Sequence, residues 1–133
     1  MASIRKVIAT TASPVAVWEA VADVGALHTR LVPGFVIDTK LEPGARIVTF
    51  GNGMVVREPI ISIDPEAQRL AWSAEGGRAT HYNSSLEVAP GPDGGSVVTW
   101  TSDFLPDSLA PEMNAAMDMG AGIMKKTLDK RAG

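Results

Sequence analysis

The period of hydrophobic and polar positions changes along the chain and divides it into strands and helices. Residues 3–11 form a strand-like segment that leads directly into a helix start. Ser13 can cap the free amides of this helix, and Pro14 fits its first turn because its missing N–H would have no partner there. Apolar residues then recur at helical spacing, namely Val17, Trp18, Val21 and Val24. The pattern predicts a strand, a tight turn and a short helix with an apolar stripe.

A second small helix or turn is predicted over residues 23–31, because this stretch is short, mixed in polarity and ends before Pro33-Gly34. Six further strands are predicted, over residues 35–41, 45–50, 54–63, 69–75, 79–88 and 96–104. The connections between them are short and rich in Gly, Pro and Asp. Tight turns of this kind join antiparallel neighbours, so the strands are expected to form one antiparallel sheet.

The last two predicted strands show the clearest alternation. One face of the first carries Tyr82, Ser84, Leu86 and Val88. One face of the second carries Val98, Trp100, Ser102 and Phe104. The opposite faces hold Thr, Asn and Glu side chains. One side of the sheet is therefore expected to face solvent and the other to face a helix or a cavity.

The C-terminal segment predicts the covering helix. Asp107 or Ser108 can cap it, Pro111 falls in its first turn, and the helical pattern continues to about Lys130. Its apolar stripe comprises Leu109, Met113, Met117 or Ala116, Gly120, Met124 and Leu128. A glycine in a helix interior costs about 1 kcal/mol relative to alanine. Gly120 and Gly122 therefore indicate a kink or a close approach to the sheet.

Composition narrows the function classes. The chain has 133 residues, 12 basic and 15 acidic side chains and a net charge of −3, which favours one domain and argues against a nucleic-acid partner. The absence of cysteine excludes disulfides, thiolate metal sites and a cysteine nucleophile. Neither a signal-peptide pattern nor an apolar run long enough to span a bilayer occurs. We therefore expect a cytoplasmic location and no integral membrane association.

Four sequence segments are similar to those of a known family: Ala12–Trp18, Val32–Phe35, Arg57–Ile60 with Asp64 and Arg69-Leu70, and Gly94–Trp100. With these segments in this order, the chain resembles the START-like (SRPBCC) superfamily, in its polyketide cyclase/dehydrase branch. The resemblance implies a single α+β domain over residues 1–133 with the helix-grip fold of the birch-pollen allergen. In that fold a curved antiparallel sheet of about seven strands wraps on a long C-terminal helix, and two short helices follow the first strand.

The resemblance also implies a cavity between the sheet and the C-terminal helix. Combined with the strand faces, it predicts ligand-binding residues on the sheet and on the helix, namely Tyr82, Ser84, Trp100, Ser102, Phe104, Met113, Met117 and Met124. It also predicts Arg30 as a ligand-binding residue near the cavity mouth. The methionine stripe is also compatible with an ordinary core. Its unbranched, polarizable side chains would suit varied apolar ligands.

Three residues are candidates for acid–base chemistry: His28, Glu58 and Tyr82. Arg57 and Glu58 are adjacent on a strand and must point to opposite faces, and the parity with Val56 and Ile60 favours Glu58 as the inward residue. Solvent-exposed or structural roles remain open for all of them. No metal-ligand spacing and no cofactor motif appear, so neither a metal nor a cofactor is expected.

Two functions follow from this pattern. The first is binding of a small, largely apolar molecule, such as a lipid-like, aromatic or polyketide-like compound, in the cavity. The alternative is an aromatase/cyclase or dehydratase-like enzyme that acts on a polyketide-type substrate in the same cavity, with Arg30 or Arg57 steadying an enolate oxygen. The sequence leaves open whether a reaction is catalysed, and it leaves a homodimer open as well.

Overall fold

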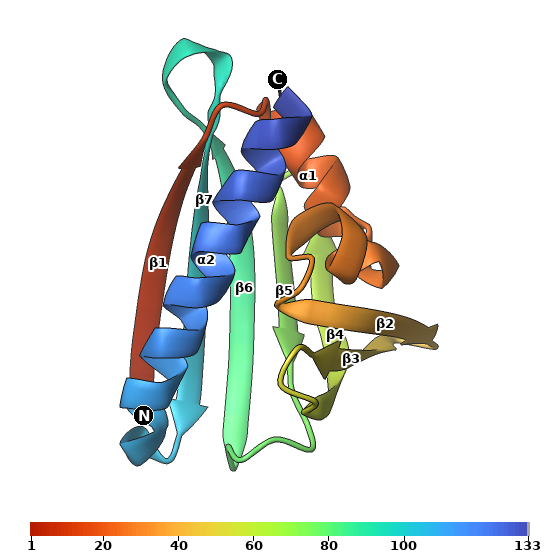
Figure 1. The fold of residues 1–133 in the computed structure, drawn as a ribbon, viewed down its shortest axis with the longest axis vertical. Coiled ribbons are helices and arrows are strands. Elements are labelled where there is room, and N and C mark those ends of the chain that lie inside the picture. Colours follow the sequence, from red (N-terminus) through yellow and green to blue (C-terminus); the bar gives the residue numbers. More distant parts are fainter. Residues whose placement is uncertain (133) are drawn as a thin grey trace.

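A seven-stranded antiparallel sheet holds a long helix against one face in the computed structural model, which describes residues 1–132 (Figure 1). The strands are β1 (Ala2–Thr10), β2 (Val36–Glu42), β3 (Ala45–Phe50), β4 (Val55–Asp64), β5 (Arg69–Ser73), β6 (His81–Pro90) and β7 (Ser96–Leu105). The helices are α1 (Pro14–Ala22) and α2 (Ala110–Ala132), with short helical segments η1 (Val24–Ala26), η2 (Leu27–Leu31), η3 (Pro92–Gly94) and η4 (Asp107–Leu109). The predicted fold class is confirmed.

The sheet has the order β1-β7-β6-β5-β4-β3-β2, so the first two strands of the chain lie at opposite edges. In Figure 1, β2 and β3 run across the view while β1, β6 and β7 run along it. Register shifts between Val36 and Asp38 and between Ile60 and Ser62 mark irregular pairing in β2 and β4. Irregularities of this kind bend strands, and the sheet curves around the helical layer.

The helix start predicted after β1 is present. Ser13 caps α1, because its side-chain oxygen accepts a hydrogen bond from the Ala16 amide at 3.2 Å. Val17 and Val21 are buried beneath the helix, as the apolar stripe predicts. Residues 23–31 form the separate segments η1 and η2 in place of one small helix or turn.

The predicted strand faces are confirmed by burial. Every second residue of β7 from Ser96 to Phe104 is buried, and Ser84, Leu86 and Val88 of β6 are buried with them. These side chains point toward α2. The alternate positions form the outer, more polar face of the sheet.

Helix α2 covers the inner face and has a buried stripe of Met117, Gly120, Met124 and Leu128. A Cβ atom built on Gly120 would lie 3.1 Å from carbons of Trp100 and Phe35. Of the two interpretations of this glycine, the close approach to the sheet is therefore the correct one. Among the helices of residues 1–132, none is long and apolar enough to cross a membrane.

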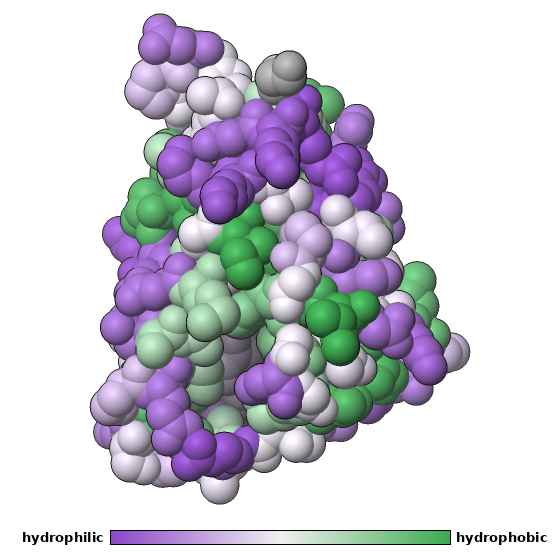
Figure 2. Space-filling model, viewed as in Figure 1, coloured by the Kyte–Doolittle hydropathy of each residue, from purple (hydrophilic) through white to green (hydrophobic). Residues whose placement is uncertain are grey.

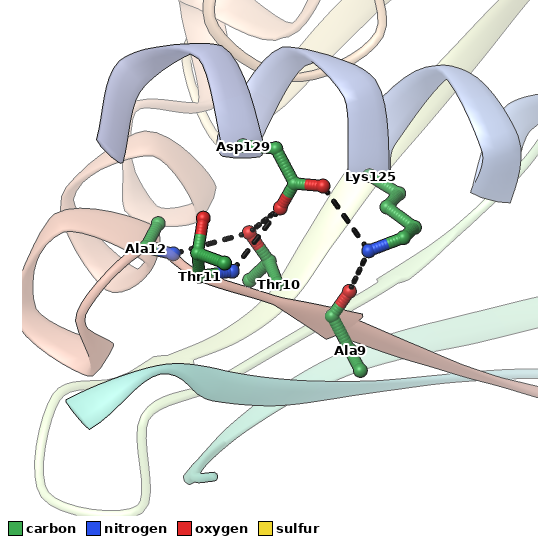
Figure 3. Close-up of polar contacts among 6 residues, drawn as sticks. All are labelled: Ala9, Thr10, Thr11, Ala12, Lys125 and Asp129. Carbon is green, nitrogen blue, oxygen red and sulfur yellow. Dashed lines mark hydrogen bonds and ion pairs between the residues drawn. The ribbon is translucent and has the colours of Figure 1, made fainter. Parts of the chain in front are cut away.

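Polar contacts fix the C-terminal end of α2 to the end of β1 (Figure 3). The Asp129 carboxylate accepts hydrogen bonds from Thr10 Oγ1 at 2.6 Å and from the Thr11 amide at 3.1 Å. Lys125 Nζ donates to the Ala9 carbonyl at 2.8 Å and to Asp129 at 3.1 Å. The Thr10 hydroxyl, the Thr11 amide and Lys125 together lower the pKa of Asp129 to about 2. The position of α2 above the sheet is thereby defined at one end.

Candidate ligand-binding cavity

A cavity of about 590 Å³ lies between the inner face of the sheet and α2. Figure 2 shows a hollow on the corresponding face of the molecule, bordered by hydrophobic and weakly polar residues and, toward its lower edge, by hydrophilic ones. Its lining comes from η2, from α2 and from strands β2 to β7. The volume falls within the range of roughly 300–1,000 Å³ that is typical of small-molecule pockets.

The wall is mainly apolar. Met113, Met117 and Met124 line it from α2, and Trp100 and Leu86 line it from β7 and β6. Within residues 1–132, and apart from the indole groups of two tryptophans, six lining residues carry polar side chains: Arg46, Asn52, Glu58, Arg78, Tyr82 and Glu112. Tyr82, Trp100 and the three methionines therefore occupy the wall positions that the sequence predicts for them.

Three residues predicted to face a ligand lie elsewhere. Phe104 is fully buried and lies outside the cavity lining. Ser84 and Ser102 are also buried and stand behind the wall, not in it. Alternation along a strand predicts the face of a side chain but not its depth, and these short side chains hydrogen-bond to Tyr82 and Trp100, which line the cavity. Ser84, Ser102 and Phe104 are therefore not expected to contact a ligand directly.

The two serines instead hold the wall residues in place. Trp100 Nε1 donates to Ser84 Oγ at 2.9 Å, and Ser84 Oγ donates to the Thr101 carbonyl at 2.9 Å. Because the only hydroxyl hydrogen of Ser84 is used there, Ser102 must donate to Ser84 across 2.8 Å. Tyr82 must then donate to Ser102 across 3.1 Å. The phenol oxygen of Tyr82 therefore keeps an acceptor lone pair but has no hydrogen left for a ligand.

A buried ion pair forms the most polar part of the wall. Arg46 of β3 lies directly opposite Glu58 of β4, and Arg46 Nε donates to Glu58 Oε1 at 2.8 Å. The side chains are 2% and 7% exposed. Arg46 Nη1 donates to the Val24 carbonyl at 3.3 Å, and its guanidinium carbon lies 5.2 Å from the centroid of the Trp72 ring. These contacts fix the charge of Arg46 at the cavity surface.

Burial raises the pKa of Glu58, and the charge and hydrogen bond of Arg46 oppose that increase. The Trp72 indole also lowers the pKa of Glu58, although Trp72 Nε1 is buried without a hydrogen bond of ordinary geometry. Burial likewise raises the pKa of Tyr82, while its contact with Ser102 lowers it. Tyr82 is consequently a neutral phenol at physiological pH, and the hydrogen-bond chain makes it unsuitable as an acid toward a ligand.

The other predicted polar residues lie outside the cavity wall. Arg30 pairs with Asp23 at 3.0 Å and does not reach the cavity, although its neighbours Leu27 and Leu31 do. Arg57 points outward and pairs with Glu42 and Glu75, as expected if Glu58 points inward. His28 is absent from the lining, and its Nδ1 is buried without a hydrogen-bond partner. The structure therefore brings only Glu58 and Tyr82 of the three acid–base candidates to the cavity.

Arg46 is the most deeply buried of the polar wall residues that sequence reasoning missed; the others are Asn52, Arg78 and Glu112. The position of Arg46 in a strand with buried neighbours Ala45 and Val48 gives no polar face from which to place it. The signal that would have found it is the hairpin register, because the tight connection at residues 51–53 sets Arg46 opposite Glu58. At the cavity mouth a second pair, Arg78 and Glu112, joins the β5–β6 loop to the start of α2.

No cluster of three or more His, Cys, Asp or Glu side chains that could hold a metal ion occurs in residues 1–132. The cavity chemistry thus rests on one ion pair, one phenol and an apolar wall.

A curved antiparallel sheet that holds a C-terminal helix over an apolar cavity defines the START-like, helix-grip class of proteins. Solved structures agree. XoxI from Bacillus cereus superimposes with a TM-score of 0.86 at 18% identity and 96% coverage of both chains. A START superfamily protein from Mycobacterium smegmatis gives 0.75 at 12% identity, with 98% of this chain and 96% of that chain covered. Norcoclaurine synthase from Thalictrum flavum gives 0.74 at 20% identity, with 97% and 84% covered.

Residues 1–132 match the family described as polyketide cyclase / dehydrase and lipid transport. The chain belongs to that family, and the resemblance stated from its sequence is confirmed. No curated protein matches it. At the identities given above, the structural neighbours establish the fold, and the family supports ligand binding in general.

Proposed function

We propose that this protein binds a small, largely apolar molecule, lipid-like, aromatic or polyketide-like, in the cavity between the sheet and α2. The observation that supports this most strongly is the cavity itself, about 590 Å³ of space with a mainly apolar wall. A well-packed protein core contains few voids larger than a water molecule, so a space of this volume is not ordinary core packing. An apolar ligand would remove this wall from water, which is a favourable process.

The test uses two neighbouring alanines of α2. Ala116 lines the cavity, whereas Ala115 is exposed on the outer side of the helix. Binding of 2-methylnaphthalene is measured by titration, following naphthalene fluorescence, for the wild type, Ala116→Leu and Ala115→Leu. A leucine at position 116 fills part of the cavity, so the dissociation constant should rise by about tenfold or more.

Ala115→Leu should bind as the wild type does, because its side chain points to solvent. Equal binding by all three proteins would place the naphthalene outside the cavity and contradict the proposal. The same holds if the wild type binds neither 2-methylnaphthalene nor a derivative of it with a polar group in place of a methyl hydrogen.

An aromatase/cyclase or dehydratase-like reaction is the second candidate, and the position of Glu58 favours it. A carboxyl group with a raised pKa can transfer protons, and the neighbouring Arg46 guanidinium can stabilise an enolate oxygen. The test follows the absorbance of aromatic product formed from a linear poly-β-ketone thioester by the wild type and Glu58→Gln. Turnover that is lost in Glu58→Gln would support catalysis. Equal rates of product formation with and without the wild-type protein would contradict the catalytic function.

Cytoplasmic location, the absence of a nucleic-acid partner and the option of a homodimer stay predictions from the sequence. They do not enter the binding proposal.

A further inference from the structure

The polar residues of the cavity wall offer a specific set of hydrogen-bonding atoms. Arg46 uses Nε and Nη1 for Glu58 and the Val24 carbonyl, and Glu58 uses Oε1 for Arg46. Both side chains line the cavity, and among residues 1–132 no hydrogen bond of ordinary geometry joins Nη2 of Arg46 or Oε2 of Glu58 to another protein atom, although the Trp72 indole acts on the Glu58 carboxylate. The wall therefore presents one free donor group and one free acceptor side by side.

Tyr82 adds a second acceptor. Its hydrogen is used in the chain through Ser102 and Ser84, so only the lone pair of the phenol oxygen faces outward from that chain. Arg46, Glu58 and Tyr82 line the same cavity, so one bound molecule can meet all three groups. A hydroxyl group, which donates one hydrogen bond and accepts others, complements this set.

The net charge of the set is the second constraint. Arg46 and Glu58 form a buried pair in which each charge already has its counter-ion at 2.8 Å. A ligand carboxylate would approach Arg46 only by competing with Glu58, and a ligand ammonium would meet the opposite conflict. Either ion would lose its hydration without gaining an unshared counter-charge, which is costly in a mainly apolar cavity.

From these two observations we propose that the Arg46–Glu58–Tyr82 group selects ligands with an uncharged hydroxyl on an apolar body, and discriminates against carboxylates and ammonium ions. The inference rests on the proposed binding function and specifies its ligand class. Arg46 donates to the ligand oxygen, and the ligand hydroxyl donates to Glu58 or to the Tyr82 oxygen.

The test compares four molecules that share one apolar body: 2-methylnaphthalene, 2-naphthylmethanol, 2-naphthoate and 2-naphthylmethylammonium. Dissociation constants for the wild-type protein are measured at pH 7. The alcohol should bind about tenfold more tightly than 2-methylnaphthalene, as expected for one well-formed buried hydrogen bond. Both ions should bind at least about tenfold more weakly than the alcohol.

Binding of 2-methylnaphthalene as tight as that of the alcohol would overturn the inference and leave the binding function standing. So would binding of either ion as tight as that of the alcohol. Failure of all four molecules to bind would overturn the binding function together with the inference.

Two variants examine the mechanism. Glu58→Gln leaves the charge of Arg46 without its counter-ion, so the preference should move from the alcohol toward 2-naphthoate. Tyr82→Phe keeps the ring in the wall and removes one acceptor, so the affinity for the alcohol should fall several-fold relative to the affinity for 2-methylnaphthalene. The Tyr82→Phe protein tests the inference even if the Glu58→Gln protein fails to fold. An unchanged ratio of the two affinities in Tyr82→Phe would exclude Tyr82 from the group.

Discussion

Trp100 connects the stability of the core with the shape of the cavity. Its ring packs beneath Gly120 of α2 and its indole nitrogen is held by Ser84, while part of the ring lines the cavity. Phe104, two positions further along the same face, is buried outside the cavity. The two residues therefore form a matched pair in which only one borders the ligand space.

We expect Trp100→Ala and Phe104→Ala each to lower the free energy of unfolding by about 3–5 kcal/mol, because both remove a large buried ring. Chemical denaturation measures this change. Only Trp100→Ala should also weaken binding of 2-methylnaphthalene. Loss of stability in Trp100→Ala with unchanged affinity would show that Trp100 is ordinary core.

At the same scale, the Arg46–Glu58 pair makes stability depend on pH. The pKa of Glu58 is higher in the folded protein than in the unfolded chain, mainly because of burial, so the folded state holds this proton more tightly. The contribution of Glu58 to stability therefore decreases as pH rises above its ordinary pKa of 4.5. Arg46 limits the decrease, because its charge lowers the pKa of Glu58.

Arg46→Met removes that opposing charge and leaves Glu58 buried without a partner. The free energy of unfolding at pH 7 should fall by about 3–5 kcal/mol. The loss should be smaller at pH 4, where protonation neutralises Glu58. Denaturation of the variant and the wild type at both pH values tests the sign, and a loss that is equal or larger at pH 4 would contradict it.

At the scale of elements, the contact between α2 and the sheet depends on one glycine. A Cβ atom added to Gly120 would lie 3.1 Å from carbons of Trp100 and Phe35. A Cβ atom added to Gly122, two residues later, would have no neighbouring atom within 4 Å. Replacing either glycine by alanine raises the helix propensity of α2. Only the methyl group added at position 120 must displace an aromatic ring or the helix.

Gly122→Ala should therefore stabilise the protein by about 1 kcal/mol. Gly120→Ala should be less stable than Gly122→Ala by about 1–3 kcal/mol, because the added methyl group overpacks the interface. Thermal or chemical unfolding of the two variants measures the difference. Equal stabilisation by both would show that α2 can move away from the sheet without cost.

At the scale of the whole molecule, local patterns were sufficient for the fold. The cap at Ser13, the alternation of β6 and β7 and the stripe of α2 each follow from short-range preferences, and the structure bears them out. The candidate site was predicted less completely. Alternation identified Tyr82 and Trp100 but could not show that Ser84 and Ser102 lie one layer deeper.

The missing part of the site depends on long-range geometry. Arg46 reaches Glu58 through strand register and the Val24 carbonyl through the packing of η1 against the sheet. Arg30 was predicted near the mouth from its place in the chain, but it pairs with Asp23. Strand parity was therefore enough to place Glu58, whereas Arg46 is recognised as a wall residue only when its partner on β4 is known.

The central claim, that a ligand enters the space between the sheet and α2, is tested most directly by NMR of methionine methyl groups. Met113, Met117 and Met124 line the cavity together with the more exposed Met54 and Met119, while Met1 is exposed at the N-terminus and lies outside the lining. Titration of ¹³C-methyl-methionine protein with 2-naphthylmethanol should shift the resonances of Met113, Met117 and Met124 and leave that of Met1 unchanged. Unchanged cavity resonances at saturating probe, or shifts confined to Met1, would contradict the claim.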